Sequence, residues 1–359
     1  MSTSKGSTSY DAFLLVSFGG PEGPDDVLPF LQNVTSGRNI PVERLELVAE
    51  HYKHRGGVSP INEHNRQLLA KIEPALVAAG LELPVYWGNR NWHPMLVDTV
   101  EQMAADGVGR AIAFVTSAFS SYSGCRQYRE NLQVACEAVG AAAPQIEKLR
   151  VFYDHPGFIE PMIESVVAAF ADVAGSGSVA AGDGEARLVF TAHSIPQSMA
   201  AGCDYEAQLA EACALVAVGA GVGAGDYDIV YQSRSGPPQV PWLEPDICDH
   251  IATLAEQNVP GVVVVPIGFV SDHMEVIQDL DTEAAAAAAE HGLAFARAAT
   301  VGDDDRFVAM IIELIEERVR GAERRALGGL EVKPDVCAAD CCLAPTRGRP
   351  PQTSPPAST

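Results

Sequence analysis

The sequence predicts an α/β protein of two doubly wound, Rossmann-like lobes, each a parallel sheet flanked by helices, with a cleft between the lobes. Three observations lead to this fold class. Short apolar runs alternate with segments of helical periodicity, both halves of the chain show this alternation, and a Gly/Ala/Ser-rich stretch, 174–185, separates the halves. Apolar runs without polar alternation are typical of parallel strands that are buried on both faces.

The first half contains four predicted strands with helices between them. Its first strand, Asp11–Phe18, is a short apolar run that ends at Gly19-Gly20-Pro21, residues that favour a turn. Further strands are predicted at Pro84–Gly88, Arg110–Thr116 and Lys148–Tyr153. Helical periodicity predicts helices at Leu45–Lys53, Arg66–Ala79, Met95–Ala105, Arg126–Val139 and Phe158–Val173.

The second half repeats this alternation. Its strands are predicted at Arg187–Thr191, Tyr227–Tyr231, Gly261–Ile267 and Leu293–Arg297. Its helices are predicted at Tyr205–Val218, Asp246–Gln257, His273–Glu290 and Asp305–Arg320. Because ligands bind beyond the carboxyl ends of the strands in doubly wound sheets, the residues that follow each strand are the candidates for chemistry.

These patterns divide the chain into four parts. We expect a flexible N-terminus (1–9), a first lobe (10–173), a second lobe that includes the closing helix (174–326) and a tail (327–359). The tail is rich in Pro, Thr and Ser, so we expect it to be loose except where its cysteines are held.

Composition excludes several classes of protein. The chain has 359 residues with 47% apolar residues, which is enough for a buried core in about two domains. Its 24 basic and 47 acidic residues give a net charge of −23, which argues against binding nucleic acid or anionic lipid. Neither a secretory signal nor a run long enough to span a bilayer is visible. We therefore expect a cytoplasmic monomer with reduced thiols and no integral membrane contact.

A histidine and a row of carboxylates follow two strands of the second half. His193 comes after the strand Arg187–Thr191, where an imidazole could accept a proton near neutral pH or bind a metal ion. After the strand Gly261–Ile267, Glu275, Asp279 and Glu283 are spaced by four residues, so they share one face of a helix. Crowded carboxylates raise one another's pKa and attract divalent cations. A packing histidine and a solvated acidic face are the alternatives.

Cationic and hydroxyl side chains cluster in the first half of this acidic chain. Arg55 lies beside a loop that contains Ser59, and Arg126 lies close to Tyr128. Arginines and hydroxyls of this kind can hold the carboxylates of a ligand, so the group indicates an anionic substrate. For each residue taken alone, ordinary surface solubility is the alternative.

The tail carries three cysteines within six residues. Cys337, Cys341 and Cys342 lie in a polar segment with no core to fill, and reducing surroundings disfavour a structural disulfide. Thiolates this close suit an iron–sulfur cluster or zinc. Cys125, in the loop after the third strand, is our candidate for a fourth ligand, and Cys203 is the second choice.

The chain resembles the ferrochelatase family. The matching segments include HYKHRGGVSPIN, SYSGCRQY, FTAHSIP and GFVSDHMEVIQDLD, and the resemblance runs from about Leu14 to Asp281. It implies a chelatase-like fold and insertion of ferrous iron, as a substrate, into a porphyrin in haem biosynthesis. The cysteine tail and the SYSGCRQY loop resemble the actinobacterial-type branch, which implies coproporphyrin III as the porphyrin and a [2Fe-2S] cluster held by Cys125 and the tail cysteines.

The resemblance also implies roles for particular residues. His193 matches the family's catalytic histidine, a metal ligand that accepts pyrrole protons, and Glu275 matches the acidic ligand opposite it. Ser59 and Tyr128 match positions that contact the porphyrin.

Two further consequences concern the path of iron and its product. Asp279 and Glu283 fall on the acidic ladder that would pass metal or protons. Phe18 stands where some relatives that use coproporphyrin carry a tyrosine able to ligate iron, and phenylalanine cannot ligate it.

Several alternatives remain open at this stage. Protoporphyrin IX could be the substrate. It carries fewer carboxylates than coproporphyrin and is less soluble in water, so an enzyme that uses it would need an apolar segment facing the membrane at the cleft entrance. Leu28–Leu31 is locally apolar, but no long apolar insertion is visible. Cobalt or nickel insertion into a sirohydrochlorin-like tetrapyrrole is a second enzyme class. A haem- or iron-binding sensor is the non-catalytic alternative.

Overall fold

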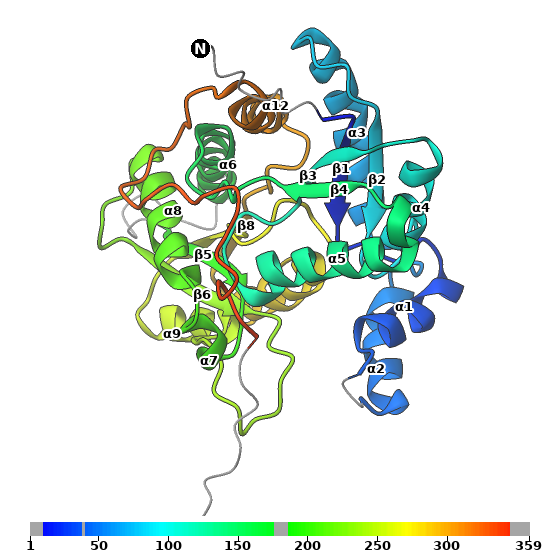
Figure 1. The fold of residues 1–359 in the computed structure, drawn as a ribbon. Coiled ribbons are helices and arrows are strands. Elements are labelled where there is room, and N and C mark those ends of the chain that lie inside the picture. The colour runs from blue at the N-terminus through cyan, green and yellow to red at the C-terminus, as the bar shows by residue number, and fades with distance from the viewer. Residues whose placement is uncertain (1–9, 38–39, 176–185, 345–359) are drawn as a thin grey trace, which may run out of the picture.

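Two parallel sheets organise the molecule. The computed structural model describes residues 10–37, 40–175 and 186–344, so the expected flexible N-terminus, most of the Gly/Ala/Ser-rich stretch and the end of the tail lie outside the described residues. The strand orders are β2-β1-β3-β4 and β6-β5-β7-β8, and all neighbouring strands are parallel. The predicted fold class of two α/β lobes is therefore confirmed (Figure 1).

The first sheet is built around a strand that is buried on both faces. Its strands are β1 (Ala12–Ser17), β2 (Val85–Asn89), β3 (Arg110–Val115) and β4 (Gln145–Lys148). Leu14 and Val16 of β1 pack on one side with α4 and α5, whereas Phe13 and Leu15 pack on the other side with α3. The helical segments of this half are η1 (Pro24–Asp26), α1 (Val27–Val34), α2 (Val42–Lys53), α3 (Ile61–Ala78), α4 (Leu96–Ala105), η2 (Tyr122–Arg126), α5 (Gln127–Val139), η3 (Gly140–Ala142) and α6 (Pro156–Gly175).

The second sheet has the same arrangement. Its strands are β5 (Arg187–His193), β6 (Tyr227–Gln232), β7 (Gly261–Val265) and β8 (Ala294–Arg297). All five residues of β7 are buried, as expected of a central parallel strand. The helical segments are α7 (Gln197–Ala200), α8 (Tyr205–Gly219), α9 (Ile247–Glu256), α10 (Met274–Val276), η4 (Ile277–Ala284), α11 (Ala285–Glu290) and α12 (Asp305–Arg320).

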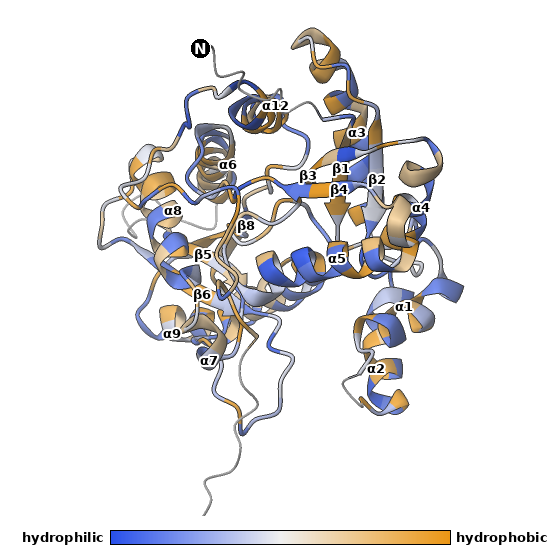
Figure 2. Ribbon diagram, in the orientation of Figure 1, coloured by the Kyte–Doolittle hydropathy of each residue, from blue (hydrophilic) through white to orange (hydrophobic). Residues whose placement is uncertain are grey.

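Helices α6 and α12 join the two sheets into one hydrophobic core. The two helices lie side by side in Figure 1; α6 also packs against β7 and β8, and α12 packs against α3 of the first lobe. One face of α12 is hydrophobic and the other hydrophilic (Figure 2). Phe307 of α12 contacts Phe114 of β3 edge to face, with the ring centroids 6.0 Å apart. The boundary between the lobes at residues 173 and 174 stays a prediction.

Several element predictions were incomplete or wrong. The fourth strand is Gln145–Lys148, not Lys148–Tyr153. The buried run that follows it leaves the sheet, and Phe152 stacks on Phe114 with the ring centroids 5.0 Å apart. The long helix predicted at His273–Glu290 is split, because π-helix η4 separates α10 from α11, and α1 was not predicted at all.

The described segment after α12, 321–344, which includes the start of the tail, contains no helix or strand, yet side-chain contacts hold it along its length. The buried Arg150 binds the carboxylate of Glu317 through two contacts of 2.8 Å and donates to the Arg325 carbonyl at 2.9 Å. Glu211 of α8 accepts from the backbone of Gly329 at 2.6 Å. Lys333 pairs with Asp204 at 2.6 Å, so the tail is fastened to the second lobe before it reaches its cysteines.

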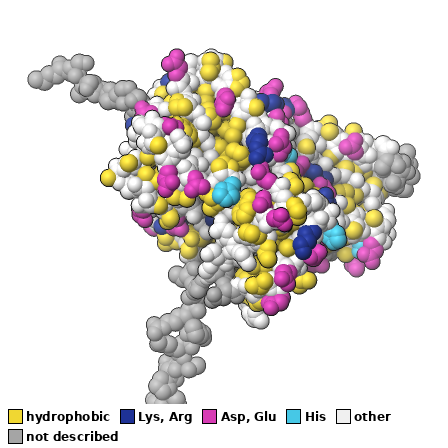
Figure 3. All heavy atoms as spheres, turned by 90° about the vertical axis from the view of Figure 1, so that its right-hand side faces the viewer, with side chains coloured by type: hydrophobic (Ala, Val, Ile, Leu, Met, Phe, Trp, Pro, Cys, Tyr) yellow, Lys and Arg dark blue, Asp and Glu magenta, His cyan; other side chains and the backbone are white. Residues whose placement is uncertain are grey.

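Surface character agrees with the acidic composition. Figure 3 views the molecule from the side of α1 to α4, where basic side chains are separated by acidic and apolar ones rather than gathered into one patch. Among the described residues, no helix combines the length and apolar character needed to cross a membrane.

Candidate functional site

The structure brings His193 and Glu275 together at the edge of the second sheet. His193 ends β5, and Glu275 lies in α10, shortly after β7. Strands β5 and β7 are parallel neighbours, so their carboxyl ends meet at the same edge. The His193 Nε2 atom lies 3.9 Å from Glu275 Oε2, and the two side chains are 33% and 49% exposed. Both groups are therefore accessible to a ligand.

Backbone contacts fix the orientation of the imidazole. His193 Nδ1 lies 2.5 Å from the carbonyl oxygen of Ser194. A hydrogen bond there requires the proton on Nδ1 and leaves the lone pair on Nε2, which faces Glu275. The buried Tyr205 donates its hydroxyl proton to the His193 carbonyl at 3.0 Å.

The segment that carries Glu275 lies close against β5. Gly268 follows β7, and a Cβ atom at this position would lie 2.8 Å from the Cα of Ala192, so only glycine allows this approach. His273 Nδ1 accepts a hydrogen bond of 3.1 Å from the backbone N–H of Glu275 at the start of α10. Burial lowers the pKa of His273, which keeps this imidazole neutral and able to accept that bond.

The acidic row continues along the π-helix. Asp279 and Glu283 line a cavity of about 240 Å³ together with residues of the β6 end and the start of α9. Ser233 Oγ donates a short hydrogen bond to Asp279, and Gln232 Nε2 donates to the same carboxylate at 3.3 Å. The Gln232 Oε1 atom is buried and has no hydrogen-bond partner among the described residues.

Burial dominates the electrostatics of Asp279. It raises the pKa of this carboxyl to about 7, the charges of Glu275 and Glu283 add to the rise, and the Ser233 hydrogen bond opposes it. A carboxyl with a pKa near neutrality can exchange protons or accept a cation at small cost, which is the behaviour expected of a functional site.

The residues predicted to contact substrate lie in two segments of the first lobe: Arg55 and Ser59 in the loop between α2 and α3, and Arg126 and Tyr128 at the junction of η2 and α5. Ser59 and Tyr128 are each 5% exposed. The guanidinium of Arg90 lies over the Tyr128 ring at 4.7 Å from its centroid and over the Phe18 ring at 5.7 Å. Arg55 donates to Thr282 of η4 at 2.7 Å and so connects the end of α2 to the π-helix.

Arg90 is a candidate that the sequence analysis missed. Its Nη1 donates to the Ser123 carbonyl at 3.3 Å, and its Nε is buried without a partner. Among the described residues it has no carboxylate within ion-pair distance. Because Arg90 directly follows β2, the rule that ligands bind beyond strand ends would have found it.

Arg126 has a different surrounding from the other predicted substrate residues. Its Nε donates to Glu130 at 2.7 Å, and its Nη1 donates to the carbonyls of Ala339 and Cys341 at 2.6 and 3.1 Å. In this structure it therefore holds the tail, and a contact with substrate stays a prediction.

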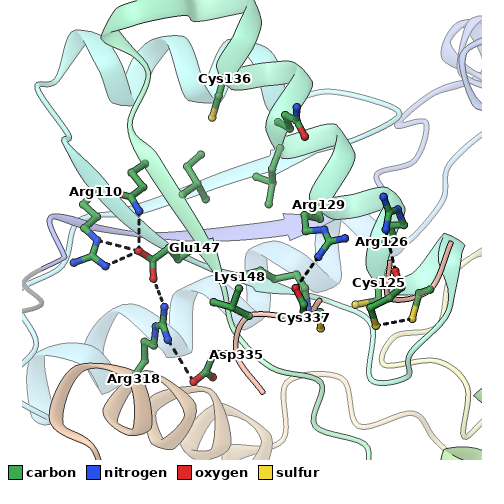
Figure 4. A pocket seen from close by; sticks show the side chains of 17 residues that line it. Arg110, Cys125, Arg126, Arg129, Cys136, Glu147, Lys148, Arg318, Asp335 and Cys337 are labelled. Atoms are coloured by element: carbon green, nitrogen blue, oxygen red, sulfur yellow. Dashed lines mark hydrogen bonds and ion pairs between the residues drawn. The ribbon is translucent and has the colours of Figure 1, made fainter. Parts of the chain in front are cut away.

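Four of the predicted cysteines line one cavity of about 500 Å³ (Figure 4). Cys125 lies in π-helix η2, and the sulfurs of Cys341 and Cys342 are 3.5 Å apart. Cys203, the second choice, is not among the lining residues and donates to the Met199 carbonyl at 3.3 Å.

These thiols suit an iron–sulfur cluster by their donor chemistry, because thiolates are its usual ligands and four of them share one cavity. They are not in a preassembled ligand shell. No group of three His, Cys, Asp or Glu side chains within residues 10–37, 40–175 and 186–344 is placed to hold a metal ion. Binding a cluster would therefore require the thiols to draw together.

Comparison with known proteins identifies the family of this chain. The model of the family described as Ferrochelatase matches residues 10–319. The chain is 55% identical to the ferrochelatase of Rhodopirellula baltica over 95% of both chains. It is 52% identical to the coproporphyrin III ferrochelatase of Streptomyces griseus over 96% of both chains, and 54% identical to that of Frankia alni over 96% of this chain and 89% of the relative.

Solved structures extend the likeness at the level of the fold. SirB from Bacillus subtilis, in a structure with Fe³⁺, is 10% identical, with a TM-score of 0.51 over 87% of this chain and 96% of SirB. With a family model that covers both sheets and relatives above 50% identity over nearly the whole length, this chain belongs to the ferrochelatase family.

Proposed function

We propose that this protein inserts ferrous iron into coproporphyrin III during haem biosynthesis. The coproporphyrin III ferrochelatases at 52–54% identity support the substrate. The observation that carries the reaction is the pair formed by His193 and Glu275, whose Nε2 and Oε2 atoms are 3.9 Å apart on segments that follow two neighbouring strands.

Insertion requires the porphyrin to lose two pyrrole protons as the iron arrives. His193 accepts one of them at Nε2, because its Nδ1 is directed at the Ser194 carbonyl, and the other passes to the carboxylate row and from there to solvent. Glu275 offers iron an oxygen ligand, and Asp279 and Glu283 extend a path of carboxylates from the 240 Å³ cavity. Carboxylates bind Fe²⁺ less tightly than imidazole or thiolate, so the ion can be released to the four porphyrin nitrogens.

The propionates of the porphyrin need cationic and hydroxyl partners from the first lobe. Arg90 supports this role best, because its guanidinium has neither a carboxylate partner among the described residues nor a partner for Nε. Ser59, Tyr128 and Arg55 are the other proposed contacts. Arg126 is proposed as a further contact on the basis of the sequence alone. Phe18 packs edge to face on Phe30 at 6.3 Å between ring centroids, so it presents an apolar surface rather than an iron ligand.

We further propose that Cys125, Cys337, Cys341 and Cys342 bind a [2Fe-2S] cluster. The shared cavity and the paired thiols support it. Such a cluster supplies one-electron redox chemistry and a cross-link. Iron insertion needs no electron transfer, so these residues would fasten the tail to η2. Thiolate ligands need reducing conditions, which fits our expectation of a cytoplasmic protein, and we keep the monomer as part of the proposal.

The test is iron insertion by His193→Ala and Glu275→Gln. Each variant should lose at least a hundredfold in the rate of Fe²⁺ insertion, while coproporphyrin III binding, followed by absorbance, is retained. His291→Ala changes an exposed histidine and should behave like the parent protein. Undiminished turnover by His193→Ala would refute the assignment.

The same assay separates the alternatives. Faster turnover of protoporphyrin IX than of coproporphyrin III would identify protoporphyrin IX as the substrate. Insertion of Co²⁺ or Ni²⁺ into sirohydrochlorin, without insertion of Fe²⁺ into either porphyrin, would assign the protein to the other enzyme class. Porphyrin binding without any turnover in the parent protein would indicate a sensor.

A further inference from the structure

The cysteine cavity is unusually basic for so acidic a protein. Its lining includes Arg110, Arg126, Arg129, Lys148 and Arg318, but only two acidic side chains, Glu147 and Asp335. The chain as a whole carries a net charge of −23. Positive charge is therefore concentrated around the cavity that the four candidate cysteines line.

Most of these cations already have a carboxylate partner. Arg110 and Arg318 both bind Glu147, and Figure 4 shows this group at the end of the cavity away from Cys125 and Cys337. Arg126 binds Glu130 at 2.7 Å. Their charges are therefore largely neutralised before any ligand arrives.

Arg129 and Lys148 differ from the others. Arg129 reaches only carbonyl oxygens, those of Cys337 and Ala338, at 3.4 and 3.5 Å. Lys148 donates to the Leu149 carbonyl at 3.0 Å and lines the same cavity as Cys125. Neither cation has a carboxylate within ion-pair distance in the part of the chain that the structure describes. The cavity therefore holds two uncompensated positive charges beside the sulfurs.

An oxidised [2Fe-2S] centre with four thiolates carries two negative charges. Placing that charge in a partly enclosed cavity is costly unless opposite charges are already fixed there. Positive charge and hydrogen-bond donors around the sulfurs also favour the reduced, more negative state, so they raise the reduction potential.

We propose that Arg129 and Lys148 are the counter-charges of this centre and that they raise its reduction potential. This inference rests on the proposed cluster. It assigns the two residues an electrostatic role on the tail side of the molecule, away from His193 and Glu275. The number of free cations matches the number of negative charges to be balanced.

The experiment measures the midpoint potential of the purified protein by titration with dithionite, followed by visible absorbance. Arg129→Gln and Lys148→Gln should each lower the equilibrium constant for one-electron reduction at least tenfold, which is about 59 mV. Arg129→Lys and Lys148→Arg keep the charge and should restore the potential of the parent protein. Arg110→Gln removes a charge from the far end of the same cavity and should change the potential much less.

The outcomes are distinguishable. A parent protein purified under anaerobic conditions without bound iron and sulfide would refute the cluster itself. If the Arg129→Gln and Lys148→Gln variants both contain the cluster and both have the reduction potential of the parent protein, the counter-charge role is refuted. If a glutamine variant loses the cluster, recovery in the charge-retaining variant supports the proposal. If both the glutamine variant and the charge-retaining variant at one position lose the cluster, while Arg110→Gln keeps it, then the shape of the side chain matters rather than its charge. That result would overturn the proposal.

Discussion

Asp279 offers a direct test of the electrostatics of the proposed iron path. Its pKa of about 7 means that the folded protein binds a proton there, whereas an exposed aspartate, with a pKa of 3.8, has lost it. Stability that depends on this proton is present at low pH and is lost as pH rises through about 7. Asp279→Asn removes the titration and should remove this dependence.

The two pKa values fix the size of the effect. The linkage relation gives a loss of about 2.5 kcal/mol in the free energy of unfolding between pH 5 and pH 8 for the parent protein. The free energy of unfolding of Asp279→Asn should not show this loss of about 2.5 kcal/mol over the same interval, because the amide stays neutral at both pH values. The physical cause is burial of a charge beside Glu275 and Glu283, which the metal ion would compensate in the working enzyme.

The assay is urea denaturation of both proteins at pH 5 and pH 8, in the presence of a chelator and without porphyrin. Titrating groups distant from Asp279 are common to both proteins and cancel in the difference, whereas Glu275 and Glu283 are coupled to it and contribute to the difference. Glu290→Gln, an exposed carboxyl at the end of α11, is the matched control and should follow the parent protein. Parallel pH dependences for Asp279→Asn and the parent would show that Asp279 is not buried as a neutral acid.

Three further predictions concern other parts of the molecule. Glu317→Gln removes the carboxylate that a buried arginine needs, so urea denaturation should show a loss of about 3 kcal/mol. Gly57→Ala should destabilise more than Gly56→Ala by at least about 1 kcal/mol in the same assay: both glycines have positive φ, but only a Cβ at Gly57 would meet the backbone of Pro24, at 2.4 Å. Arg90→Gln should raise the dissociation constant of coproporphyrin III about tenfold or more in an absorbance titration, because a charge-assisted hydrogen bond is lost. An unchanged affinity would remove Arg90 from the porphyrin site.

Apolar runs were sufficient to predict the two sheets, but not where every strand ends. The run after Lys148 is apolar because Phe152 and its neighbours enter the core between the lobes, and burial alone does not distinguish that path from a strand. The π-helix has no local signal in the sequence, since its residues are compatible with an α-helix. Its register is set by contacts such as that between Asp279 and Ser233, which come from a distant segment.

The candidate site was predictable where strand ends could be located. His193 and Glu275 follow strands whose apolar runs are unambiguous, so their shared edge could be inferred. Arg90 follows β2, whose sequence mixes aromatic, glycine and polar residues, and its role emerged only from its packing on Tyr128. The tail contacts of Arg126 depend on a segment more than 200 residues away and had no local signature.

The route of the tail imposes an order on biogenesis. Cys125 leaves the ribosome long before Cys337, Cys341 and Cys342, and the intervening chain builds the whole second sheet. The proposed centre needs all four sulfurs, so it could be loaded only after the chain through Cys342 has been synthesised, and the Lys333–Asp204 ion pair holds that part of the chain against the second lobe. Chains that stop before Cys337 would keep both sheets but lack three of the four proposed ligands, so the colour of the proposed cluster would report that synthesis had passed Cys342.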